Sequence, residues 1–338
     1  MTITFAAIGL THSHIDGQAD CLLRAGATFA AFHEPLAELA VPFAEKYPQA
    51  KRVADPRAIL EDAGIHMVLT AAIPAERAGI AIAAMQHGKD VMTDKPGMTT
   101  FAQLDEIKRV QRETSRIFSV CYSEHFQTRS TVKAGELVRA GAIGEVVNTV
   151  GLGPHSLTNN ERAPYFFDRR QYGGILCDIG SHQVEQFLFF ADTLDAEVVS
   201  ATVANRGHPE HPGLQNVGDM HLRSPKATGY IRLDWLTPNG LGTWGDGRLT
   251  IVGTEGYIEL RKYIDIAGRP GKDHLFLVDN KGTNYVDCSD VALPYGPALI
   301  ADVLNRTETA MPQAHCYKTM ELALEAQELA ERGTEWQQ

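Results

Sequence analysis

Asp178 and His182 stand four residues apart in the segment 173–182, which begins with a pair of glycines. On a helix this spacing places both side chains on one face. A carboxylate beside an imidazole that titrates near neutral pH is suited to acid–base work, and the two glycines would let the backbone run close to something small. The same spacing also serves ordinary helix surfaces, and Asp178 could simply cap its helix. The pair alone therefore leaves both interpretations open.

The elements before residue 122 alternate short apolar runs with amphipathic stretches. Strands are expected at 3–8, 27–33, 66–72, 90–93 and 117–121, and helices at 15–25, 36–46, 75–86 and 100–114. A further helix is expected to have Asp55 as its N-cap and Pro56 as its first residue. Strands that alternate with helices indicate βαβ units and a parallel sheet. Residues 1–121 are therefore predicted to form a doubly wound, dinucleotide-binding domain of the Rossmann type, an α/β fold.

Residues 122–338 follow a different pattern. Helices are expected at 127–140, 178–191, 296–306 and 313–332, strands at 145–152, 195–205, 217–223, 227–235, 247–253, 256–261, 274–279 and 283–287, and a polar loop at 153–173. Successive strands separated by turns predict a large, mainly antiparallel open sheet. We expect an α+β domain for substrate binding and oligomerisation, whose last helix could pack back on the first domain.

Composition narrows the class of protein. The 338 residues, 44% hydrophobic and 22% charged, suit about two globular domains. A formal net charge of −11 argues against a nucleic-acid binder, which needs a basic stripe. No run approaches the ~18 apolar residues of a membrane span. Five scattered cysteines without a CxxC motif, and a first segment that reads as a strand rather than a signal peptide, predict a cytoplasmic protein.

A nucleotide site is expected where the first strand ends. The turn after that strand is Gly9, Leu10, Thr11, His12, Ser13 and His14. Glu34 closes the second strand twenty residues past His14, the place of an acid that binds an adenosine ribose. No Lys or Arg follows it directly, and a carboxylate repels a 2′-phosphate, so NAD is favoured over NADP. Thr11 and His14 occupy the later glycine positions of G-x-G-x-x-G, which leaves open a Rossmann domain without nucleotide.

The two histidines of this turn also raise the question of a metal. Helical metal pairs are spaced i,i+4, whereas His12 and His14 are spaced i,i+2, with no acid partner at the usual spacing. His208 and His211 lie in a proline-rich loop. All four are interpreted as surface or cofactor-contacting histidines, and no metal is predicted.

Two further motifs carry a family resemblance. The stretch 66–97 runs through Pro74 and a G-K-D-V segment at 88–91 to D-K-P-G at 94–97, and 173–182 contains two glycines followed by D-x-G-x-H. With the turn at 253–256, these motifs resemble the Gfo/Idh/MocA oxidoreductases, named for glucose–fructose oxidoreductase and inositol dehydrogenase. The resemblance covers about residues 2–330. It implies a catalytic Lys95, a substrate-holding Asp178, a proton-carrying His182 and a cis bond before Pro96.

Three positions depart from the family pattern. Asp94 stands where Glu is usual, and Arg77 stands where His is common after the Pro74 turn. The segment 123–125, Ser-Glu-His, stands where an Arg often follows the sixth strand, which suggests a changed substrate pocket.

The resemblance and the residue types together predict an NAD(P)-dependent dehydrogenase that acts on a secondary alcohol or ketone of a sugar, cyclitol or similar polyol. His182 would carry the hydroxyl proton, Lys95 would stabilise the developing alkoxide, and Asp178 would bind a neighbouring hydroxyl. Cofactor contacts are expected from the 9–14 turn and from Glu34, Ala72, Ile73, Pro74, Lys95 and Pro96; substrate contacts are expected from Tyr122, His125, His155, Tyr165 and Arg169.

Two alternatives remain at this point. The chain could be a non-catalytic NAD(P)-binding regulatory protein, since the family includes such members, or an NAD-dependent glycosidase of the same family. The resemblance further implies a homo-oligomer, a dimer or tetramer, formed through the open face of the second-domain sheet.

Overall fold

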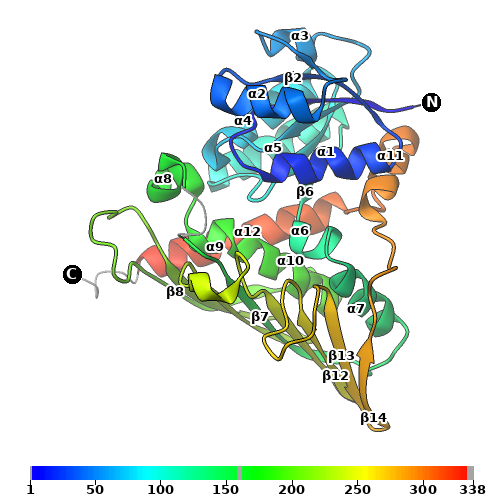
Figure 1. The fold of residues 1–338 in the computed structure, drawn as a ribbon, viewed down its shortest axis with the longest axis vertical. Coiled ribbons are helices and arrows are strands. Elements are labelled where there is room, and N and C mark those ends of the chain that lie inside the picture. Colours follow the sequence, from blue (N-terminus) through cyan, green and yellow to red (C-terminus); the bar gives the residue numbers. More distant parts are fainter. Residues whose placement is uncertain (1, 158–161, 333–338) are drawn as a thin grey trace. The chain divides into compact units, whose positions relative to one another are not determined.

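The computed structural model describes residues 2–157 and 162–332 (Figure 1). The chain divides into two compact units, Met1–Cys121 with Pro294–Tyr317, and Tyr122–Leu293 with Lys318–Gln338. The segment 294–317, which the sequence analysis placed in the second domain, thus groups with the first unit. Its contacts explain this, because the Tyr295 hydroxyl lies 2.7 Å from Ser119 Oγ and the Gln313 side chain donates to the Phe118 carbonyl at 2.9 Å.

The first unit is built on a six-stranded, wholly parallel sheet in the order β3-β2-β1-β4-β5-β6. Its strands are β1 (Thr4–Ile8), β2 (Thr28–His33), β3 (Lys51–Arg52), β4 (Met67–Thr70), β5 (Asp90–Asp94) and β6 (Phe118–Cys121). Every residue of β4, β5 and β6 is buried, as expected for parallel strands that helices cover on both faces. The predicted Rossmann-type sheet is confirmed, and β3 is a short strand that the sequence analysis missed.

Helices flank this sheet (Figure 1). They are α1 (His14–Arg24), α2 (Ala37–Lys46), α3 (Arg57–Leu60), α4 (Pro74–Gln86), α5 (Phe101–Thr114) and α11 (Tyr295–Asn305). Helices α4 and α5 contact each other, as do α1 and α11. The Thr100 hydroxyl caps α5 by accepting from the Gln103 amide at 3.2 Å. Helix α3 is assigned from Arg57 with Pro56 before it, one residue later than predicted, and the Asp55 carboxylate makes the expected capping contact by accepting from the Arg57 amide at 2.9 Å.

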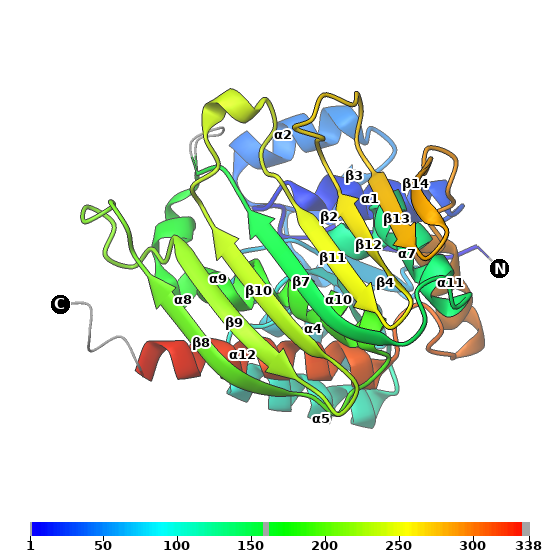
Figure 2. The same cartoon turned by 90° about the horizontal axis from the view of Figure 1, so that it is seen from below.

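The second unit contains an eight-stranded sheet in the order β14-β13-β12-β11-β7-β10-β9-β8 (Figure 2). Its strands are β7 (Val146–Pro154), β8 (Glu197–Ala204), β9 (Val217–Arg223), β10 (Thr228–Asp234), β11 (Arg248–Gly253), β12 (Gly256–Arg261), β13 (His274–Asp279) and β14 (Gly282–Val286). All neighbouring pairs are antiparallel except β7 with β10, which is parallel. The expected mainly antiparallel sheet is confirmed.

Several helices, most of them short, belong to this unit, and the last of them begins in the first unit. They are α6 (Ser123–Phe126), α7 (Arg129–Arg139), η1 (Pro164–Phe167), α8 (Arg169–Tyr172), α9 (Ile175–Asp178), α10 (Gly180–Ala191), η2 (Asn239–Leu241) and the C-terminal α12 (Gln313–Arg332). Helix α10 packs on β7 and β10. The predicted helix 178–191 is therefore two helices, α9 and α10, and the predicted loop 153–173 contains η1 and α8. Asp178 ends α9, so it is not the N-cap of a longer helix.

Two observations bear on the expected environment of the chain. All five cysteines are buried free thiols, which agrees with the absence of a disulfide framework in the sequence. Among the described residues, no helix is both long enough and apolar enough to cross a membrane.

Candidate active site

The turn that follows β1 is shaped by a close approach to the end of β4. Gly9 has φ +79°, and a Cβ at this position would lie 2.6 Å from the Cβ of Ala72. Glycine is therefore required both by the left-handed conformation and by the neighbouring chain. The His12 amide donates to the Ala71 carbonyl at 2.8 Å, and α1 begins at His14. Of the glycines in a full fingerprint, this first one is present, and its conformation fits a turn that leads into an anion-binding helix N-terminus.

Glu34 lies beside a hollow at the end of β2. The hollow has a volume of about 370 Å³ and is lined by His33, Glu34, Pro35, Arg52, Val53 and Ala54. The Glu34 side chain accepts from the amides of Leu10 and Leu36, each at 2.9 Å, and Glu34 is only 3% exposed. Because a carboxylate offers about four acceptor sites, these two bonds orient it without exhausting it. This arrangement fits the ribose of a dinucleotide.

Arg52 is a member of this hollow that the sequence analysis missed. Its guanidinium donates to the Glu34 carbonyl at 2.8 Å. The residue reaches Glu34 because β3 pairs with β2 in parallel register, with Phe32 opposite Arg52. Arg52 lies 18 residues after Glu34 and comes from the neighbouring strand, so the residues directly after Glu34 gave no sign of it.

Asp94 and Arg77 form the centre of a buried polar cluster in the first unit. The Asp94 carboxylate lies 3.0 Å from Arg77 Nη2, 2.9 Å from His14 Nδ1 and 3.7 Å from His12 Nδ1. Burial would raise the pKa of Asp94, but the charges of His14 and Arg77 outweigh burial and hold that pKa well below its ordinary value. Burial, reinforced by His14, holds the pKa of His12 well below its own ordinary value. Asp94 is thus a buried anion that is paired with the permanent charge of Arg77 and contacted by the His14 imidazole.

The same cluster supplies three potential metal ligands. One atom each from His12, His14 and Asp94 lies within 4.8 Å of the others. The sequence analysis found no acid partner at the usual spacing, and the structure supplies one from outside that spacing, because Asp94 approaches His14 from 80 residues away. The permanent charge of Arg77, 3.0 Å from Asp94, opposes a divalent cation at this carboxylate. That the protein needs no metal stays a prediction.

The main chain around Lys95 is held by the same arginine. Arg77 Nε donates to the Ala72 carbonyl at 2.7 Å, and Nη1 donates to the carbonyls of Lys95 and Pro96. The Lys95–Pro96 peptide is cis, as the resemblance implied. Pro74 is the first residue of α4, and Ile73 is its N-cap. The predicted cofactor residues of this region thus follow the ends of two neighbouring strands. Ala72, Ile73 and Pro74 follow β4, and Lys95 and Pro96 follow β5.

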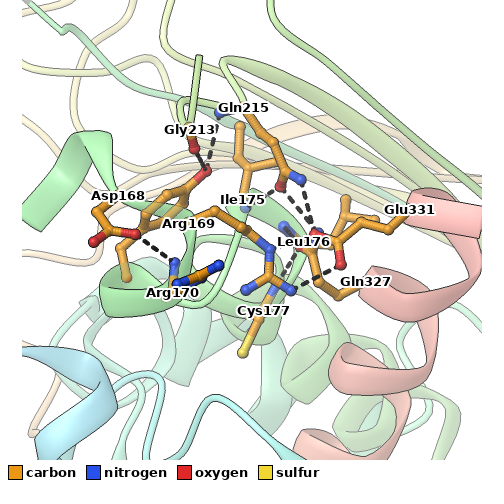
Figure 3. A network of polar contacts seen from close by, with 11 residues as sticks. Asp168, Arg169, Arg170, Ile175, Leu176, Cys177, Gly213, Gln215, Gln327 and Glu331 are labelled. Carbon is orange, nitrogen blue, oxygen red and sulfur yellow. Dashed lines mark hydrogen bonds and ion pairs between the residues drawn. The ribbon is translucent and has the colours of Figure 1, made fainter. Parts of the chain in front are cut away.

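In the second unit, the paired glycines before Asp178 face another part of the chain. Gly173 and Gly174 have φ +91° and +89°. A Cβ on Gly174 would overlap the side-chain amide of Gln327 from α12. The Gln327 Oε1 accepts from the amides of Leu176 and Cys177 at 3.1 and 3.4 Å, so it satisfies the first turn of α9 (Figure 3). The small neighbour that the glycines admit is therefore a helix-capping glutamine.

Asp178 and His182 lie in consecutive short helices of this unit and are 5% and 1% exposed. The His182 ring lies 6.0 Å, centroid to centroid, from that of Tyr122, which is also buried. Lys95 belongs to the first unit, whereas Asp178 and His182 belong to the second. The roles of all three stay predictions.

A buried ion pair adjoins His182. Glu124 Oε2 accepts from Lys262 Nζ at 2.7 Å and from Gln183 Nε2 at 2.8 Å, and Lys262 also donates to Gln186 at 2.8 Å. Burial would raise the pKa of Glu124, but Lys262, and after it His182 and His155, hold that pKa far below its ordinary value. The carboxylate thus stays charged. The sequence marked Glu124 only as a departure, and Lys262 gave no signal.

The other predicted substrate residues divide into two groups. His155 lies between Trp235 and Trp244, with ring centroids 5.3 and 4.7 Å away, and the Tyr165 ring stacks on Phe166 at 4.4 Å. His125 is instead paired with Glu185 at 2.9 Å, and Arg169 is paired with Glu331 of α12 (Figure 3). These partners give the last two residues structural contacts, and a substrate role for any of the four stays a prediction.

The fold and the candidate site together define the class of protein to which the chain belongs. A parallel sheet with a tight glycine turn and a carboxylate beside a hollow belongs to a dinucleotide-binding protein, and the second unit supplies a buried acid, an imidazole and an ion pair. Two family models match the chain: "Oxidoreductase family, NAD-binding Rossmann fold" over residues 9–122 and "GFO/IDH/MocA C-terminal domain" over residues 131–259.

Individual relatives agree with these matches. The chain is 24% identical over 309 residues to an NAD⁺-dependent scyllo-inositol 2-dehydrogenase of Bacillus subtilis, covering 88% of this chain and 78% of that protein. It is 43% identical to a crystal structure described as an oxidoreductase from Erwinia carotovora atroseptica, with a TM-score of 0.95 and coverage of 97% and 99%. An oxidoreductase from Agrobacterium radiobacter in complex with NAD⁺, L-tartaric acid and magnesium shares the fold at 18% identity, TM-score 0.81 and coverage of 98% and 97%.

The chain belongs to the Gfo/Idh/MocA family of oxidoreductases. The predictions of the family, of NAD as cofactor and of an NAD-dependent dehydrogenase acting on CH–OH groups are confirmed at the level of the class.

Proposed function

We propose that this protein transfers a hydride between NAD and a secondary alcohol or ketone of a sugar, cyclitol or similar polyol. The observation that carries the proposal is the buried imidazole of His182, which shares its helix region with Asp178 and is electrostatically coupled to the ionised Glu124. An imidazole in such surroundings is suited to accept and return a proton. The names of relatives that act on inositol and on levoglucosan support a polyhydroxylated substrate.

Each residue has a separate task in this proposal. His182 takes the hydroxyl proton in the direction of oxidation and returns it in the direction of reduction. Asp178 binds a neighbouring hydroxyl, and the Lys95 ammonium stabilises the developing alkoxide. NAD, when bound, supplies the hydride acceptor. None of these steps requires a metal.

Glu34 supports NAD rather than NADP as the preferred cofactor. Its carboxylate lines the hollow and is fixed by two backbone amides. A 2′-phosphate at this place would meet that negative charge, whereas a ribose hydroxyl could donate to it.

The test is a Lys95→Met variant assayed for NADH formation in EDTA with scyllo-inositol, myo-inositol, levoglucosan and D-glucose. We expect kcat to fall at least about 100-fold, as when a group that stabilises developing charge is removed, while NAD still binds. Lys89→Met is the matched control, because Lys89 is also a buried lysine of the same unit. Its ammonium donates to the Asp62 carbonyl.

Turnover by Lys95→Met at the wild-type rate would refute the role of Lys95. Wild-type protein that binds NAD without turning over any polyol would favour the regulatory alternative. Cleavage of a glycoside without net NADH would favour the glycosidase alternative.

A further inference from the structure

Arg77 is completely buried, with 0% of its surface exposed. Arginine is almost never fully buried unless it is paired, because its charge cannot be neutralised by losing a proton. The partners of Arg77 are three main-chain carbonyls and one carboxylate, those of Ala72, Lys95, Pro96 and Asp94. Nε and Nη1 donate the hydrogen bonds, whereas Nη2 faces Asp94 at 3.0 Å as an ion pair without a hydrogen bond.

These partners lie at adjacent places in the sheet. Ala72 follows the end of β4, while Asp94 closes β5 and Lys95 and Pro96 come directly after it. Strands β1, β4 and β5 are consecutive in the sheet. One guanidinium therefore joins the carboxyl ends of β4 and β5, where ligands of parallel sheets bind.

Asp94 extends the connection to the third strand of this group. Its second oxygen lies 2.9 Å from His14 Nδ1, the first residue of the helix that follows β1. The cofactor turn and the Lys95 segment are thus linked through two side chains, Arg77 and Asp94. Neither side chain is exposed enough for water to replace the other.

We propose that Arg77 is a positioning residue of the reaction, which fixes the main chain of Lys95 against the cofactor turn through Ala72 and Asp94. The proposal rests on the proposed catalytic role of Lys95. Arg77 does not itself need to touch substrate or cofactor, because its hydrogen bonds go to main-chain carbonyls and its charge is paired with Asp94.

Lysine cannot replace this arginine in the same role. The planar guanidinium presents its donors in a rigid fork, whereas an ammonium offers three donors from a single atom. Arg77→Lys keeps the charge beside Asp94, but one nitrogen cannot reach Ala72 and both carbonyls after β5 at once. A purely electrostatic contribution to folding would survive this substitution, and the fixed position of Lys95 would not.

The first measurement compares turnover and NAD binding. We expect kcat of Arg77→Lys to fall about 10- to 100-fold, since a misplacement of a catalytic group by about 1 Å can cost 100-fold in rate. The Kd for NAD should change no more than about threefold. Asp94→Asn is a second variant of similar size, which should lower kcat in the same direction. Arg109→Lys is the control, because Arg109 also engages two carboxylates, Glu106 and Glu113, on the exposed face of α5.

The second measurement needs no substrate. Lysines are acylated with an N-hydroxysuccinimide ester of acetate, and the rate at Lys95 is read by mass spectrometry relative to Lys89. Both are buried in the same unit, 4% and 5% exposed, and Lys89 donates to the Asp62 carbonyl, which is not a partner of Arg77. We expect the Lys95/Lys89 ratio to rise at least about threefold in Arg77→Lys, because loosening the segment opens access to its amine, and to stay unchanged in Arg109→Lys.

A folded Arg77→Lys protein with wild-type kcat overturns the proposal, and so does a reduced kcat with an unchanged Lys95/Lys89 ratio. If Arg77→Lys does not fold, Asp94→Asn is judged by the same two criteria. Full turnover in Lys95→Met would separately refute the role proposed for Lys95, and the acylation ratio would still decide whether Arg77 fixes the Lys95 segment.

Discussion

The ion pair of Glu124 and Lys262 makes a prediction about the stability of the second unit. Lys262 is 0% exposed and Glu124 is 2% exposed, and their charged atoms lie 2.7 Å apart. Lys262→Met removes the cation, while the carboxylate stays buried with Gln183 as a neutral partner. The free energy of unfolding falls mainly because the remaining carboxylate is buried without a compensating charge, and less because the attraction between the two charges is lost.

The magnitude follows from the burial of both groups. Breaking a buried pair by removing one partner costs about 3–5 kcal/mol. In a unit of about 150–250 residues, 1 kcal/mol corresponds to about 2–4 °C, so we expect Tm of this unit to fall by roughly 6–20 °C. The double variant Glu124→Gln/Lys262→Met buries no charge and should regain about half of the loss or more.

Differential scanning calorimetry and urea titration of the full chain measure both quantities. The control is Lys133→Met, which breaks a Lys133–Glu136 pair of similar length, 2.8 Å, at partly exposed positions. That change should cost no more than about 1 kcal/mol. The reasoning would be refuted by a Lys262→Met protein as stable as Lys133→Met, or by a double variant less stable than the single one.

Two further predictions concern the cofactor turn. The pKa of His12 lies well below its ordinary 6.5, so the unfolded chain binds more protons and the free energy of unfolding falls as pH drops below 6.5. His12→Gln should reduce this slope by up to about 1.4 kcal/mol per pH unit, measured by urea denaturation at several pH values, and an unchanged slope would contradict the assignment. Gly9→Ala should lower both Tm and NADH affinity more than Gly26→Ala, because both have positive φ and only Gly9 would clash; equal losses in the two would contradict this.

The sequence was most informative where structure is local. The alternation of apolar runs and amphipathic stretches predicted the parallel sheet, since strands with buried faces and helices with one apolar stripe have different periods. The predicted ends of helices were wrong where contacts with residues distant in sequence decide the local structure. Ile179 stands between α9 and α10, and it interrupts the single helix expected at 178–191. The amides at the start of α9 are capped by Gln327, about 150 residues away in sequence.

The candidate site was predictable only in part, for the same reason. Motif positions identified Lys95, Asp178 and His182, but they carried no information on what surrounds each side chain. Arg52 reaches the Glu34 hollow through strand pairing, and Lys262 reaches Glu124 from 138 residues away. Such partners are set by the tertiary fold, and spacing rules extend only over a few residues of one element.

Arg77 and Asp94 show how two separate departures from a motif can be a single feature. In the sequence, Asp94 shortens an acid by one methylene, and Arg77 lengthens and charges a base 17 residues earlier. In the structure they form an ion pair of 3.0 Å at the ends of neighbouring strands. The guanidinium of Arg77 also donates to the carbonyls beside Lys95. The two changes are therefore expected to depend on each other, because substituting either one alone leaves a buried charge without its partner.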